Sequence, residues 1–459
     1  MKHKIRGILA GILAAALLLT PALAAGTEQA PQQLPDPWAY SAIADSYAMG
    51  LMDDNFTTYI QSPLTLEQLE HMTGIVAAKL AALALPVNPN AEAAALVLDT
   101  TRGGVMNALY QECAAYAMDG LDGGTAAFLS GLGVVQGDQS GDLALERACT
   151  YQEAMVMAQR LILAVYDAND AGSKGLLWKA VNGSNTLYLL GTIHLDRDNV
   201  YPLHKSLRQA LYSAQKVAFE LDFNDTDGMA EFVAMQTYAD GSALKDHISP
   251  ALYERVSAAL KALDMTQEQI DTYKPWALAS TFTALASTDA TTSGNAMAID
   301  LYLNSAATWA GLPVEGVETY ALQGNLFDTL SAEYQEEYLD AALSIYEAGL
   351  EGAQTDESTA QAAAENEQML SAMFAAWKAR DVEAFSKTYD KAAIVNSDDE
   401  LNARLFTDRD PGMIQAAAAY LETEGENTFF LAVGAGHMTD PGGIVSGLRA
   451  LGYTVELVP

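Results

Sequence analysis

The sequence predicts an α/β domain with a mostly parallel sheet and a large helical cap over residues 176–459, preceded by an all-α region. Two observations lead to this prediction. From Leu176 onward, short apolar runs alternate with helical patterns, which is typical of a mostly parallel sheet. The helical stretches between these runs are unusually long, so we expect a cap over one edge of the sheet. The patterns before Leu176 are helical.

The first 24 residues predict a secretory signal peptide. Three basic side chains precede an apolar run, residues 7–20, and an Ala-x-Ala cleavage site ends at Ala24. We therefore expect the protein to be secreted, extracellular or associated with the cell wall, with residues 25–35 as a linker. Export would permit a disulfide between Cys113 and Cys149, although a pair of buried thiols fits the sequence equally well.

The overall composition is that of a globular protein and argues against nucleic acid as a partner. The chain has 459 residues, enough for two or three domains, and 50% of them are hydrophobic. Its 59 Asp and Glu against 24 Lys and Arg give a formal charge of −35, which repels nucleic acid and anionic lipid. No stretch beyond residue 24 is long and apolar enough to cross a membrane, so we expect no transmembrane segment after signal cleavage.

Residues 36–165 contain a helix–loop–helix pattern that repeats. One helix is expected after Thr65 and another after Thr150, where Glu153 lies three residues further on and closes a capping box. A fragment of a third copy starts at Thr101. These features resemble the S-layer homology (SLH) repeat, which implies binding to the cell-wall polysaccharide of Gram-positive-type bacteria.

The repeats depart from the SLH pattern at its arginine, because Leu66 and Tyr151 stand where Thr-Arg-x-Glu is usual. A helical packing region without a ligand is therefore the alternative to a wall-binding module. A pull-down of residues 25–165 on purified cell walls would separate the two.

The α/β region is expected to contain six strands, and the first two form a hairpin because Asn182-Gly183 lies between two apolar runs. The expected strands are residues 177–181, 187–190, 216–223, 313–318, 428–433 and 453–458. Helical patterns cover residues 202–214, 225–311, the region up to about 404, 411–423 and 443–451.

Four of these strands end in side chains that could bind a ligand. In a parallel sheet the carboxyl ends of the strands share one edge, where the chain faces a crevice. Two strands run into the similar motifs Gly191–His194 and Gly434–His437, so each delivers a histidine after a glycine. A third carries Glu220 and Asp222 on the face opposite its apolar residues, and a fourth ends at Glu318. We expect these side chains to converge.

Two imidazoles and one or two carboxylates suit a divalent metal ion such as Zn, Mn or Co. Such an ion lowers the pKa of a bound water to about 7, which provides a nucleophile near neutral pH. A carboxylate that does not bind the ion could be the general base, and Glu220 and Glu318 are both candidates. Gly191 and Gly434 are expected to let the backbone turn tightly beside each histidine. The simpler alternatives are structural, hydrogen-bonded histidines and a Glu318 that caps the following helix.

Six motifs occur in order within residues 176–459: Leu177-Trp178, Gly191-Thr192-Ile193-His194, Tyr201-Pro202-Leu203, Phe219-Glu220-Leu221-Asp222, Gly316-Val317-Glu318-Thr319 and Gly434-Ala435-Gly436-His437. Together they resemble the TraB/PrgY/GumN family, to which the Tiki proteases are related. The resemblance implies a metal-dependent hydrolase that clips peptide bonds near the N-termini of secreted proteins. It also implies that two histidines and a glutamate are essential, which here are His194, His437 and Glu220.

The resemblance adds two further positions. Family members commonly carry Arg-Asn before the penultimate helix, where this chain has Arg409-Asp410. Arg409 is therefore a candidate catalytic residue, and the carboxylate in place of the amide implies a different charge preference if this position orients substrate or ligands. Asp300 lies where members tend to place an aspartate after a glycine, although Ile299 precedes it here, and it is a further site candidate.

The leading hypothesis is an exported metallohydrolase that acts on peptides or proteins. A peptide-binding or sequestering protein on the same scaffold, as the pheromone-control members of the family suggest, is the first alternative. The second is that the N-terminal repeats make the protein mainly a cell-wall adhesion module. Incubation with a peptide library, with and without Mn, Co or Zn, would separate catalysis from sequestration.

Overall fold

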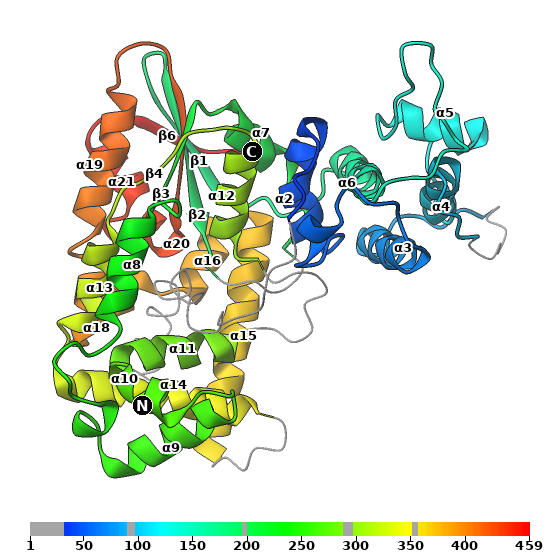
Figure 1. Ribbon diagram of the computed structural model, residues 1–459. Helices are drawn as coiled ribbons and strands as arrows, with labels where there is room; N and C mark the ends of the chain where they lie inside the picture. The colour runs from blue at the N-terminus through cyan, green and yellow to red at the C-terminus, as the bar shows by residue number, and fades with distance from the viewer. Residues whose placement is uncertain (1–31, 90–96, 195–199, 288–296, 351–356) are drawn as a thin grey trace.

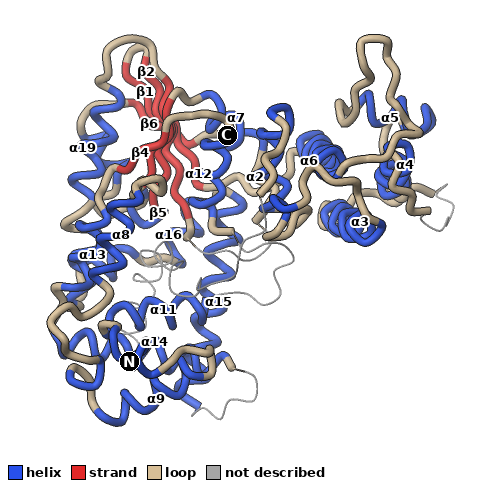
Figure 2. The backbone as a smooth tube through the Cα atoms, viewed as in Figure 1, coloured by secondary structure: helices blue, strands red, loops and turns tan. Residues whose placement is uncertain are grey.

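The computed structural model describes residues 32–89, 97–194, 200–287, 297–350 and 357–459, and it contains a six-stranded sheet (Figure 1, Figure 2). The signal peptide expected in residues 1–24 lies outside the described residues. No helix in the described part of the chain is long and apolar enough to cross a membrane. The strands are β1 (Leu176–Asn182), β2 (Asn185–Thr192), β3 (Lys216–Phe219), β4 (Val314–Gly316), β5 (Thr428–Gly434) and β6 (Thr454–Leu457).

The sheet is mostly parallel, as the sequence predicts. Its strand order is β4-β3-β5-β2-β1-β6; neighbours from β4 to β2 are parallel, whereas β1 is antiparallel to both β2 and β6. β1 and β2 form the predicted hairpin, in which Asn182 pairs with Asn185 and Gly183 has a φ of +58°. Thr192 pairs with Gly434 at the ends of β2 and β5. The two glycine–histidine motifs therefore leave the sheet side by side at one edge.

The third strand is shorter than the sequence predicts. The pattern indicates a strand over residues 216–223, but β3 ends at Phe219. Both faces of β3 are covered, because every residue from Val217 to Leu221 is buried, and Glu220 and Asp222 lie beyond the end of the strand. Strands covered by helices on both faces lose the alternating pattern. Asp222 is only partly buried, and its carboxylate accepts a hydrogen bond of 2.8 Å from the backbone N–H of Asn224, so it stabilises a turn.

Helices cover both faces of the sheet and form a cap beyond one of its edges. They are α7 (Lys205–Ser213), α8 (Thr226–Met235), η5 (Leu244–Asp246), α9 (Pro250–Lys261), α10 (Gln267–Thr272), α11 (Pro275–Ser287), α12 (Ile299–Trp309), α13 (Tyr320–Asp328), α14 (Ala332–Gly349), α15 (Glu357–Ala379), α16 (Val382–Thr388), α17 (Lys391–Val395), α18 (Glu400–Phe406), α19 (Asp410–Leu421), α20 (Ala435–Met438) and α21 (Ile444–Ala450). Figure 1 shows α7 and α12 on one side of the sheet and α19 and α21 on the other. It also shows α20, which directly follows β5, at the edge nearest the cap helices α11 and α14. The cap therefore lies beyond the carboxyl ends of the parallel strands.

The N-terminal region is built from helices, three of which begin at the predicted threonines. Its elements are η2 (Pro37–Ala39), α2 (Tyr40–Ala48), η3 (Phe56–Thr58), α3 (Leu66–Ala81), α4 (Arg102–Ala114), η4 (Leu121–Gly123), α5 (Gly124–Gly131) and α6 (Tyr151–Ala168). The side chains of Thr65, Thr101 and Thr150 each accept a hydrogen bond from a backbone N–H in the first turn, and Thr150 with Glu153 forms the predicted capping box. Isolated backbone pairings bring the segments before α3, α4 and α6 together.

The two cysteines of this region do not form a disulfide. Cys113 and Cys149 are buried free thiols. Burial raises the pKa of each thiol to about 12. Because the thiolate is the reactive form, neither cysteine is a nucleophile at neutral pH.

Candidate metal centre

The structure brings His194, His437 and Glu220 together at the carboxyl edge of the parallel strands. Their exposed fractions are 2%, 5% and 2%. Nε2 of His194 lies 3.6 Å from Oε1 of Glu220, and Nε2 of His437 lies 3.8 Å from the same oxygen. Side chains that are far apart in the sequence therefore meet at one carboxylate oxygen.

Each of the two imidazoles is held by an aspartate. Nδ1 of His194 lies 2.6 Å from Oδ2 of Asp300, and Nδ1 of His437 lies 2.6 Å from Oδ1 of Asp410. A carboxylate can only accept a hydrogen bond, so each Nδ1 carries a proton and Nε2 is left as the atom that can bind an ion. Histidine ligands of metal ions are oriented in this way, with a carboxylate behind the ring.

The carboxylates around His194 favour a positive charge at this place. Burial alone would lower the pKa of His194, but Asp300 and Glu220 outweigh burial and raise it to about 10. The hydroxyl of Thr192 fixes Asp300 from the other side by donating a hydrogen bond of 2.8 Å to Oδ1. A bound cation could replace the proton on Nε2, because histidine binds metal ions in its deprotonated form.

Arg409 lies between the two glutamates of the site. Its guanidinium donates hydrogen bonds of 2.6 Å to Oε2 of Glu220 and to Oε2 of Glu318. Burial alone would raise the pKa of Glu220, but Arg409 and the two histidines outweigh it and hold that pKa well below its usual range. Glu220 is therefore ionised. The alternative in which Glu318 caps the next helix is wrong, because the side chain of Thr319 caps α13.

Nothing in the sequence points to Lys391, which completes the surroundings of His437. Nζ of Lys391 donates hydrogen bonds of 2.7 Å to Oδ2 of Asp410 and 2.9 Å to the backbone oxygen of Thr439. Its exposed fraction is 1%, although a lysine in a helical stretch is usually on the surface. The ring of Phe406 lies 4.8 Å from Nζ of Lys391 and 5.1 Å from the imidazole of His437. Lys391 therefore fixes Asp410 as Thr192 fixes Asp300.

The charges and distances of the site fit a divalent cation. When both histidines are neutral, four carboxylates and two cationic side chains give the site a net charge of −2. The carboxylates are those of Glu220, Asp300, Glu318 and Asp410, and the cations are Arg409 and Lys391. An ion with four ligands at about 2.1 Å holds its ligand atoms about 3.4 Å apart, close to the 3.6 and 3.8 Å observed. Among the described residues, no three His, Cys, Asp or Glu side chains are arranged so that they could hold a metal ion as they stand, so an ion at this place would require the ligands to move closer together.

Both glycines are needed for close packing and not for a tight turn. The φ of Gly434 is −49°, which any residue adopts, and Gly191 lies within β2. A Cβ at position 434 would lie 3.0 Å from Nε2 of His194 and 3.2 Å from Oε1 of Glu220. A Cβ at position 191 would lie 2.9 Å from Cα of Ala435. Gly434 therefore keeps the space beside Nε2 of His194 open, and Gly191 lets α20 lie close to β2.

Gly434→Ala is expected to abolish tight metal binding while leaving the protein folded, because the added methyl group would occupy the space beside Nε2 of His194. Metal analysis after gel filtration, together with a thermal unfolding curve, measures both effects. Gly412→Ala on α19 is the matched control, since a Cβ at that position would meet no atom within 4 Å apart from its chain neighbours and the backbone of its own helix. A wild-type metal content in Gly434→Ala would mean that no ion uses this space.

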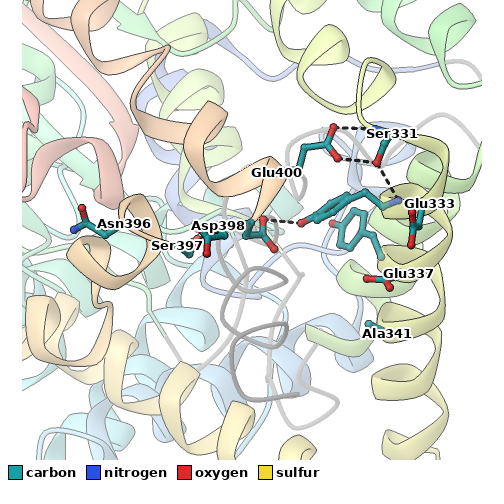
Figure 3. Close-up of a pocket in the computed structure, with 11 residues that line it drawn as sticks. Ser331, Glu333, Glu337, Ala341, Asn396, Ser397, Asp398 and Glu400 are labelled. Atoms are coloured by element: carbon teal, nitrogen blue, oxygen red, sulfur yellow. Dashed lines mark hydrogen bonds between the residues drawn. The ribbon is translucent and has the colours of Figure 1, made fainter.

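A cavity of about 630 Å³ lies in the cap, apart from the candidate metal centre (Figure 3). It lies between α14 and the segment that joins α17 to α18, and Glu400 at its rim accepts hydrogen bonds from the backbone and side chain of Ser331. The lining residues are Ser331, Glu333, Tyr334, Glu337, Tyr338, Ala341, Asn396, Ser397, Asp398, Asp399 and Glu400. The residues of the candidate metal centre do not line this cavity.

Comparison with known protein families gives a match to the α/β region. The model of the TraB/PrgY/gumN family matches residues 176–457, more than half of the chain. No curated protein and no solved structure matches. The matched range covers the whole sheet and every residue of the candidate metal centre.

Proposed function

This chain belongs to the TraB/PrgY/gumN family, and on that basis we propose that it is a metal-dependent hydrolase of peptides or proteins. One observation supports this most directly. Nε2 atoms of His194 and His437 face the same oxygen of Glu220 at 3.6 and 3.8 Å, and an aspartate holds each imidazole from behind. This donor set suits Zn, Mn or Co.

The residues divide into groups that bind and groups that orient. His194, His437 and Glu220 would hold the ion, which when bound acts as a Lewis acid and lowers the pKa of water. Asp300 and Asp410 keep the proton on each Nδ1, so that Nε2 is the free ligand atom. Both imidazoles are thereby fixed before any substrate binds.

The two glutamates have different freedom to accept a proton. Both oxygens of Glu318 accept hydrogen bonds from Arg409, and Nε2 of Gln323 donates one of 3.0 Å to Oε2 of each glutamate. Oε1 of Glu220 accepts from the backbone N–H of Gly434 at 2.7 Å and faces both histidines. Glu220 is therefore the carboxylate that can bind the ion or take a proton from an attacking water, and Glu318 holds Arg409 in place.

Incubation of the purified chain with a peptide library tests this function. We expect cleavage products with Zn, Mn or Co, none after treatment with a chelator, and none with Glu220→Gln, because the amide can neither accept the proton nor provide the charge. Asp222→Asn is the matched control, since that carboxylate stabilises a turn just beyond the same strand. Tight peptide binding without any product under every metal would favour the sequestering alternative.

The place of action is a separate proposal. The basic and apolar residues before Ala24 support export. The threonine-capped starts of α3, α4 and α6 support an SLH-like arrangement. Cell-wall binding through residues 36–165 stays a prediction, which the pull-down on purified walls tests.

A further inference from the structure

Helix α12 lies between the candidate metal centre and the N-terminal region. Residues two positions apart on an α-helix point about 200° apart around its axis, so Asp300 and Tyr302 face different sides of α12. Asp300 holds Nδ1 of His194. Tyr302, with an exposed fraction of 1%, faces α2, which packs alongside α12 (Figure 1).

Asp45 on α2 links the N-terminal region to α12. Its Oδ1 accepts a hydrogen bond of 2.5 Å from the hydroxyl of Tyr302, and its Oδ2 accepts one of 2.8 Å from Nε2 of Gln159 on α6. Asp45 is 5% exposed, and a buried carboxylate is costly unless its oxygens have partners. At the far end of α12, the ring of Trp309 packs against that of Tyr40 with centroids 5.0 Å apart. The contact between α2 and α12 therefore combines hydrogen bonds at Asp45 with a ring contact at the far end of α12.

A second link reaches the chain that follows His194. Nζ of Lys79 on α3 donates a hydrogen bond of 2.8 Å to the backbone oxygen of Tyr201. The hydroxyl of Tyr201 donates one of 2.7 Å to the backbone oxygen of Met297, just before α12. The N-terminal region therefore contacts α12 directly and is linked through Tyr201 to the backbone just before α12.

We propose that the N-terminal helical region, residues 37–168, sets the geometry of the His194–Asp300 pair, with Asp45 and Tyr302 as positioning residues. The other half of the centre is held differently, because Lys391 fixes Asp410. Loss of the contact between α2 and α12 should therefore loosen Asp300 and leave Asp410 unchanged. A test by metal affinity rests on the proposed function. The hydrogen bond between His194 and Asp300 can be followed in the metal-free protein, so a test by this bond does not.

Tyr302→Phe tests the proposal because it removes one hydroxyl and keeps the ring. In the metal-free protein, NMR can follow the Nδ1–H protons of the two histidines, assigned by their loss in His194→Ala and His437→Ala. We expect faster exchange with water for the His194 proton only. In competition with a chelator, affinity for the metal that binds the wild type should fall by up to about tenfold, because direct partners of ligating histidines are worth about 10–100-fold and Tyr302 acts only through α12.

Tyr110→Phe is the matched control, since it removes a hydroxyl that donates a 2.7 Å hydrogen bond to the backbone oxygen of Leu121 inside the N-terminal region. Both readouts should keep their wild-type values. Asp45→Asn is a second variant with the same expected direction as Tyr302→Phe. Equal changes in Tyr110→Phe and Tyr302→Phe, or unchanged proton exchange in both Tyr302→Phe and Asp45→Asn, would overturn the proposal. A wild type that binds none of the metals would count against the proposed function, while proton exchange would still decide the positioning role.

Discussion

His194→Ala and His437→Ala are each expected to reduce bound divalent metal from stoichiometric to undetectable after gel filtration. Each change removes one of the two imidazoles that face Glu220, and neither Asp300 nor Asp410 can reach past the missing ring. Asp300→Ala and Asp410→Ala should be milder, with affinity weakened about 10–100-fold, because the ligand stays and only the group that orients it is lost. Metal analysis measures the bound metal of the histidine variants, and chelator competition measures the affinity of the aspartate variants.

His247→Ala is the matched control for the histidine variants. Its Nε2 lies 2.8 Å from the hydroxyl of Ser242, and its ring stacks on Tyr238, so it has no part in the centre. This variant should keep the metal content of the wild type. If His194→Ala or His437→Ala kept it too, an ion would have to bind elsewhere and the proposed centre would be wrong.

Arg409→Met is expected to lower the free energy of unfolding by about 3–5 kcal/mol, the usual cost of removing one partner from a buried ion pair. Arg409 is 3% exposed and is the cation that contacts both Glu220 and Glu318. Methionine keeps much of the volume but leaves two buried carboxylates without that partner. Hydrolysis should be lost as well, since Glu220 would move. Urea unfolding followed by circular dichroism measures the stability.

Arg404→Met on α18 provides the comparison for Arg409. Its side chain is 28% exposed and lies 3.5 Å from Glu400, so its removal should cost less than about 1 kcal/mol. Adding Glu318→Gln to Arg409→Met should recover part of the lost stability, because one of the two uncompensated charges disappears. Equal unfolding midpoints for the two arginine variants would contradict the charge-partner role of Arg409.

The sheet and the convergence of the histidine motifs could be predicted from the sequence, because each motif follows a continuous apolar run that only a buried strand explains. The end of β3 could not. Residues 217–221 are buried on both sides of the sheet, and without an exposed face the pattern gives no boundary. The local sequence pattern therefore showed where the strands lie. The end of β3 depends instead on helices that pack on it from elsewhere in the chain.

The aspartates behind the histidines show the same limit. Asp300 and Asp410 both lie in the first turn of a helix, where acidic residues are common because they interact favourably with the helix dipole. Nothing local distinguishes them from ordinary acidic residues at helix starts. Only the packing of α12 and α19 on opposite faces of the sheet turns each towards an imidazole. Lys391 is hidden in the same way, because its burial depends on the placement of α17.

β2 and β5 are adjacent parallel strands, and Thr192 pairs with Gly434 where both end. Neighbouring strands lie about 4.7–4.9 Å apart in any sheet, because backbone hydrogen bonds set that distance. Backbone hydrogen bonds between β2 and β5 therefore set the distance between the two segments that carry the imidazoles. This distance does not depend on which apolar side chains fill the core. Core residues can drift during evolution without changing this separation, as long as the two strands stay paired.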